Sequence, residues 1–65
     1  MDLNQLFRLK EDMLKDLAIA VENMSFKDEE TKAMYYFTSM EAIMDFYTKA
    51  MIVVINNESK KTRAA

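Results

Sequence analysis

The sequence has no cysteine, histidine, glycine or proline among its 65 residues. Without cysteine neither a disulfide nor a thiolate zinc site can form, and without histidine the commonest metal ligand and general base is missing. Glycine and proline supply the corners of tight turns, so their absence predicts long helices joined by very few turns. These absences favour an all-α protein that is not an enzyme and that binds no cofactor.

The formal net charge of −2 is too small to steer the chain strongly towards nucleic acid or an anionic membrane. The first residues show no basic segment followed by a continuous apolar run, so we expect no signal peptide and a cytoplasmic location. Frequent lysine, asparagine, isoleucine and methionine point to an AT-rich genome. We therefore expect a small regulatory protein of a bacterium or a phage.

A first helix is predicted over residues 2–24 by apolar residues that recur at heptad spacing. About three positions in seven are apolar, which is typical of a helix packed in a bundle. Lys10 interrupts this stripe, and its long aliphatic stem can lie along the apolar surface. The stripe consists of Leu3, Leu6, Phe7, Met13, Leu14, Leu17, Ala20, Val21 and Met24.

The segment between the helices contains two residues that favour a helix start. Ser25 followed by Asp28 resembles a capping pair, and Asp28 is equally suited to be the N-cap itself. The carboxylates of Glu29 and Glu30 suit the first turn of a helix, where backbone amides are free. A connection this short makes the two helices antiparallel neighbours.

A second helix is predicted over residues 28–56, and it is apolar on more than one side. We expect the first helix to cover one stripe, made of Ala33, Tyr36, Phe37, Met40, Ile43, Met44, Tyr47, Ala50, Met51 and Val54. A second apolar strip would then remain in water. The last residues, 58–65, are polar and without periodicity, so we expect a disordered tail after a hairpin over residues 1–57.

An exposed strip of this size on so short a chain predicts self-association. We expect two hairpins to pair through their second helices and to form a homodimeric four-helix bundle. The residues assigned to this self-association are Met34, Tyr35, Ser39, Ala42, Phe46 and Val53.

A carboxylate metal site is the one metal chemistry that the composition allows. Glu41 and Asp45 are four residues apart and share a helix face. Helical carboxylate sites also use a Glu-x-x-His pair, which this chain cannot supply. We therefore interpret both acids as part of a solvated helix edge, with Asp45 paired to Lys49, and expect no metal site.

The function that we expect is protein binding by the dimer, to a partner that the sequence does not identify. Candidate partner contacts are Ile19, Ile52 and Ile55. One alternative is a nucleic-acid-binding dimer that uses the basic residues Arg8, Lys15, Lys60, Lys61 and Arg63, although nearby acids oppose it. Another is a membrane-associated protein, because 33–55 is long enough to span a bilayer although it carries three charged residues.

Overall fold

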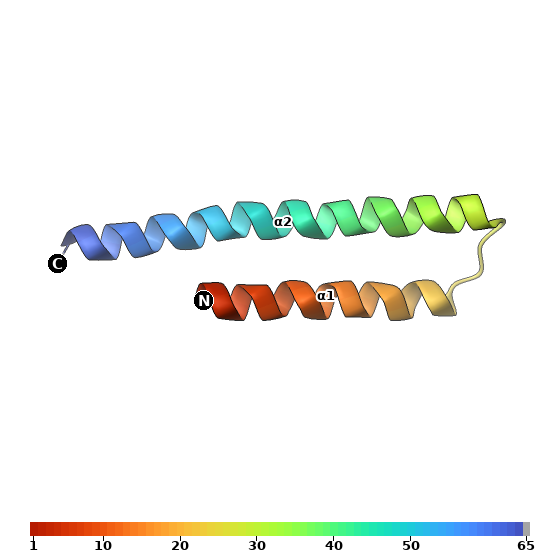
Figure 1. The fold of residues 1–65 in the computed structure, drawn as a ribbon, viewed down its shortest axis with the longest axis horizontal. Coiled ribbons are helices and arrows are strands. Elements are labelled where there is room, and N and C mark those ends of the chain that lie inside the picture. Colours follow the sequence, from red (N-terminus) through yellow and green to blue (C-terminus); the bar gives the residue numbers. More distant parts are fainter. Residues whose placement is uncertain (65) are drawn as a thin grey trace.

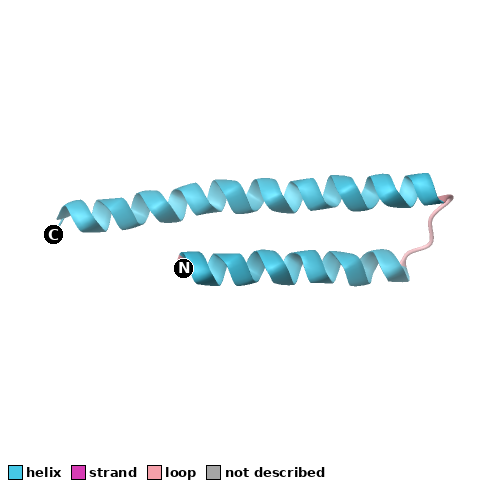
Figure 2. Cartoon of the chain, in the orientation of Figure 1, coloured by secondary structure: helices cyan, strands magenta, loops and turns pink. Residues whose placement is uncertain are grey.

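The computed structural model describes the backbone of residues 1–64 and the side chains of residues 1–58. Its two helices, α1 (Leu3–Asn23) and α2 (Glu29–Ala64), lie side by side and run in opposite directions (Figure 1). A short turn joins them, and the described residues form no strand (Figure 2). The prediction of an all-α antiparallel hairpin is confirmed.

The first helix begins where a reciprocal pair of hydrogen bonds caps it. The Gln5 backbone N–H donates to the Asp2 carboxylate at 2.8 Å, and the Asp2 N–H donates to the Gln5 side-chain oxygen at 2.9 Å. This capping box satisfies amides that have no partner within the helix. At the other end, the Met24 N–H donates to the Val21 carbonyl at 3.3 Å. The predicted range of residues 2–24 is therefore correct to within one residue at each end.

The second helix is capped by Asp28 and not by Ser25. The Thr31 backbone N–H donates to the Asp28 carboxylate at 2.8 Å, and α2 begins at the next residue, Glu29. This hydrogen bond, with a second from the Thr31 side chain, holds the pKa of the Asp28 carboxyl below its ordinary value of 3.8. The ionised Asp28 carboxylate therefore stabilises the folded state more than the protonated carboxyl does.

We expect Asp28→Ala to lower the melting temperature of the hairpin by a few degrees near neutral pH. Because the folded-state pKa of Asp28 is depressed, its stabilising effect is present above the unfolded pKa and is lost as pH falls through the folded pKa. Thermal melts followed by circular dichroism at neutral and acid pH would measure this. Thr31→Val keeps the backbone donor and removes only the side-chain hydrogen bond, so it should lower the melting temperature by less than Asp28→Ala does. An Asp28→Ala effect that is equal at both pH values would contradict the assignment.

The second helix is much longer than the first and continues to Ala64, whereas the sequence predicted an end near residue 56. Asn56 and Asn57 disfavour a helix by only about 0.7 kcal/mol each, and neither glycine nor proline follows to break it. The C-terminal end of α2 consequently projects past the N-terminus of α1 (Figure 1).

Very little of the hairpin is fully buried. Among the described side chains, only Leu6 and Val21 are buried, and both belong to α1. The side of α2 that faces α1 is half-buried, and it consists of Lys32, Tyr36, Ser39, Met40, Ile43, Tyr47, Ala50, Met51 and Val54. The Cα atoms extend over 56 × 15 × 9 Å. Two helices therefore make a single thin layer with most of its surface in water.

Candidate interaction surface

The contact between the helices includes one charged side chain, Lys10, in the middle of α1. Its amine lies 4.2 Å from the ring centre of Phe7 and 4.9 Å from that of Tyr47 on α2. It also lies 3.6 Å from the Glu11 carboxylate. The Lys10 side chain is only 12% exposed, so it packs as part of the helix contact, as the sequence predicted for its stem. The shared amine also shows that Phe7 and Tyr47 are on the same side of the hairpin.

The strip predicted for self-association is mostly exposed, as a surface that binds a second chain must be. Met34, Tyr35, Ala42, Phe46 and Val53 are all exposed, whereas Ser39 is half-buried because it is turned towards α1. At the turn end of the strip, the ring of Phe26 packs on that of Tyr35 with 5.5 Å between centres and 50° between planes. We call Tyr35, Ala42, Phe46 and Val53 the tyrosine strip.

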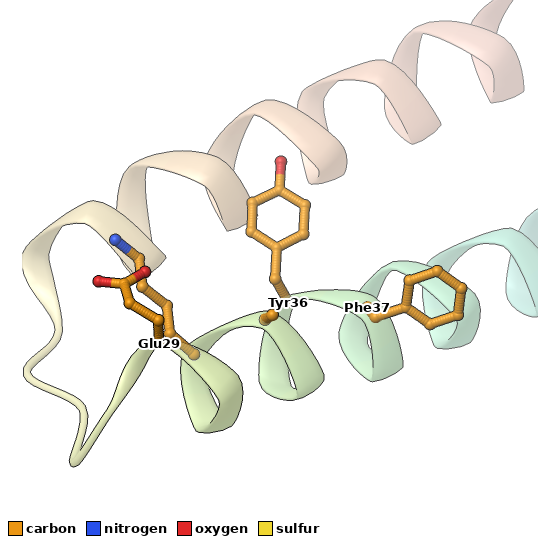
Figure 3. Close-up of a pocket in the computed structure, with 5 residues that line it drawn as sticks. Glu29, Tyr36 and Phe37 are labelled. Carbon is orange, nitrogen blue, oxygen red and sulfur yellow. The ribbon is translucent and has the colours of Figure 1, made fainter.

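A second exposed apolar side of α2 was missed by the sequence analysis. Phe37 and Met44 were expected to be covered by α1, but Phe37 is 62% exposed and Met44 is also exposed. Ala33, at the start of the same stripe, is exposed as well. In Figure 3, Tyr36 points from α2 towards α1, whereas the neighbouring Phe37 lies along the outside of α2. The prediction that one helix covers this whole stripe is wrong.

Surface hollows gather around Phe37. One is lined by Glu29, Lys32, Ala33, Tyr36 and Phe37 (Figure 3). Phe37 also lines two further hollows. Met40 and Met44 line one of them, and Met34 and Thr38 line the other. These are open depressions between side chains of a single helix, of the shape that side chains of a packed neighbour fill.

The antiparallel geometry decides which residues of α1 share a face with Phe37. In each helix, the residue that follows an inward-facing residue is turned by about 100° about the helix axis. Because the helices face each other and run in opposite directions, these following residues lie on the same face of the hairpin. On α1 they follow Leu6, Met13 and Leu17, and on α2 they follow Tyr36, Ile43, Ala50 and Val54. The apolar residues of the resulting face are Phe7, Leu14, Ala18, Phe37, Met44, Met51 and Ile55, and we call them the phenylalanine face. Four polar residues lie on the same side because they follow the covered residues Lys10, Val21, Met40 and Tyr47, and these are Glu11, Glu22, Glu41 and Thr48.

The opposite face of the hairpin has a different composition. It carries the residues that precede the inward-facing ones, which are the tyrosine strip and Lys49 on α2 and, on α1, the apolar Leu9 and Ala20 with the polar Gln5, Asp12 and Asp16. These three polar side chains are exposed. The tyrosine strip is therefore bordered on α1 by Asp12 and Asp16, whereas the phenylalanine face includes Phe7, Leu14 and Ala18 on α1 and lies beside Glu11 and Glu22.

The three isoleucines predicted as partner contacts do not form one patch. Ile19, Ile52 and Ile55 are all exposed. In the antiparallel arrangement, however, Ile19 lies near the turn, whereas Ile52 and Ile55 lie towards the open end of the hairpin. Ile55 also belongs to the phenylalanine face.

The predicted basic and acidic residues lie on the outside of the helices. Arg8 and Lys15 are exposed on α1, and the side chains of Lys60, Lys61 and Arg63 lie outside the described residues. Asp45 pairs with Lys49 at 2.9 Å, as the sequence predicted. Among the described residues, no three carboxylates come close enough together to hold a metal ion. Neither described helix has the combination of length and apolarity that crossing a membrane requires.

The chain was also compared with known proteins. No protein-family model, no curated protein and no solved structure matches it.

Proposed function

We propose that this chain is a non-catalytic protein-interaction module whose hairpins pair into a homodimeric four-helix bundle. The observation that carries the proposal is the imbalance between burial and exposure. Leu6 and Val21 are the fully buried side chains of the described region, yet large apolar side chains are exposed along both helices. Contiguous exposed apolar surface of this kind marks association sites.

The size and shape of the hairpin support association. Its accessible surface is 5367 Å², whereas a compact monomer of 7.6 kDa exposes about 4,300 Å². Its radius of gyration is 16.1 Å, against about 11 Å for a compact domain of this length. Short domains without disulfides or metals commonly complete their core through oligomerisation. A second hairpin would supply the missing layer.

The chemistry of the side chains supports a binding role over a catalytic one. The sequence offers neither cysteine nor histidine as a nucleophile or general base. The hollows around Phe37 are open, and apolar side chains line them together with a few charged ones. Methionine and aromatic side chains adapt to and anchor protein partners. We therefore propose that the dimer acts by binding another protein, with the apolar face that remains free after dimerisation as the contact.

The proposal predicts that thermal stability depends on protein concentration. If folding is coupled to dimer formation, a hundred-fold increase in protein concentration raises the melting temperature of the two-chain dimer by about 10 °C. Circular dichroism melts over that range measure the shift, and sedimentation equilibrium gives the mass. A hairpin that sediments as a monomer and melts at the same temperature at every concentration would overturn the proposal.

A further inference from the structure

We infer that the second hairpin docks on the phenylalanine face, not on the tyrosine strip that the sequence suggested. The inference rests on the proposed homodimer and assigns its contact surface. In this arrangement a second copy of the chain covers Phe7 and Leu14 of α1 together with Phe37 and Met44 of α2. The tyrosine strip stays on the outside of the bundle, where it is available to a different protein.

Both helices contribute apolar side chains to the phenylalanine face. Phe7 on α1 is 47% exposed and Phe37 on α2 is 62% exposed, although both are large aromatic residues. Leu14 and Ala18 on α1, and Met51 on α2, are half-buried beside them. Glu41 and Thr48 are the polar residues of α2 among these following positions, and Glu11 and Glu22 are those of α1. A four-helix bundle needs apolar side chains from all four helices, and this face supplies them from both helices of each hairpin.

The two faces of the hairpin also differ in their charges. Pairing two hairpins through the tyrosine-strip face would bring Asp12 and Asp16 of both copies to the contact. Like charges at an interface oppose association, and desolvating them adds to the cost. The phenylalanine face has Glu11 and Glu22 of α1 at the corresponding positions, but Glu11 lies 3.6 Å from the Lys10 amine, which offsets one of these two charges. Its neighbouring cation, Lys10, is already packed over the rings of Phe7 and Tyr47 and lies near Glu11.

The area of the phenylalanine face also suits a dimer contact. From Ala33 to Ile55 the face is about 33 Å long at 1.5 Å per residue, and two adjacent helices are about 20 Å wide. The footprint is then roughly 650 Å² per hairpin, before the corrugation of the side chains is included. Each partner of a standard stable interface buries about 800 Å². The face is therefore large enough for a dimer without any contribution from the other side.

The decisive experiment compares two matched substitutions on α2, Phe37→Glu and Phe46→Glu, in the full chain. Both replace an exposed phenylalanine with the same helix-favouring acid, and only the first lies on the phenylalanine face. We expect Phe37→Glu to weaken dimerisation about 30-fold or more, as loss of an anchor residue does. Phe46→Glu should change it by less than about threefold. Sedimentation equilibrium over a range of concentrations gives both dissociation constants.

A second measurement keeps the inference testable if Phe37→Glu also unfolds the chain. Because the protein has no cysteine, a single introduced thiol reports its own surroundings. Met44→Cys places the thiol on the phenylalanine face, and Ala42→Cys places it on the tyrosine strip two residues away. In the dimer we expect Met44→Cys to react with a maleimide about tenfold more slowly than Ala42→Cys, and dilution to the monomer should abolish the difference.

The outcomes separate this inference from the proposed function. A dimer that is lost in Phe37→Glu and kept in Phe46→Glu supports both. The reverse pattern, or protection of the thiol in Ala42→Cys, keeps the homodimer but overturns its assignment to the phenylalanine face. Loss of the dimer in both variants would also overturn the assignment, because both faces would then be needed. An unmodified chain that is monomeric at all concentrations overturns the proposed function itself.

Discussion

Leu6→Ala is expected to unfold most of the hairpin at room temperature. The Leu6 side chain is 1% exposed, and with Val21 it forms the fully buried core of the described residues. Truncating a buried leucine to alanine costs about 2–5 kcal/mol. A single core of this size supplies no more than about 3–5 kcal/mol of net stability. One substitution can therefore remove most or all of the free energy of unfolding.

Urea unfolding followed by circular dichroism would measure this loss, with every variant at the same protein concentration because association also contributes to stability. Leu3→Ala is the matched control, since Leu3 lies one turn earlier on α1 and is exposed. We expect it to cost less than about 1 kcal/mol. If Leu6→Ala unfolds at the same urea concentration as Leu3→Ala, the helix contact is not organised around Leu6.

The bounds of α1, the start of α2 and the inward side of α1 were predictable because they depend on local chemistry, whereas the end of α2 was not. Heptad spacing placed Leu6 and Val21 in the apolar stripe, and the structure buries both. The first helix begins beside the capping pair of Asp2 and Gln5, whose side chains satisfy the free amides within one turn of the chain. For the second helix the sequence left Ser25 and Asp28 as alternatives, because either side chain can accept a hydrogen bond from a helix N-terminus.

The exposed side of α2 could not be predicted in the same way. Tyr36 and Phe37 are both apolar and adjacent, so periodicity assigns both to one wide stripe. A single neighbouring helix covers only part of that stripe, and packing decides which part. In the structure Tyr36 is half-buried whereas Phe37 is exposed. The short connection already predicted the antiparallel direction, but only packing shows that Tyr36 faces α1, which places Phe37 on the same face as Phe7.

Lys10 shows how the hairpin tolerates a charge beside this apolar face. Its aliphatic stem is covered by the helix contact, and its amine lies over the rings of Phe7 and Tyr47. A cation over an aromatic ring gains about 0.5–2 kcal/mol, with the larger values where water is excluded. Glu11 offers the amine an acceptor at 3.6 Å. Both the long stem and the positive charge of Lys10 therefore contribute to the contact between the helices.

Substitution of Lys10 separates these two contributions. Lys10→Glu places a negative charge against the negative faces of two rings and beside the Glu11 carboxylate, so we expect it to lower the free energy of unfolding by about 2–3 kcal/mol. Lys10→Met keeps an unbranched apolar stem and should cost less than about 1 kcal/mol. Urea titrations of the two variants at equal concentration give the comparison. Equal stability of the two would mean that the rings do not hold the cation, and Lys10 would then contribute to the helix contact by its stem alone.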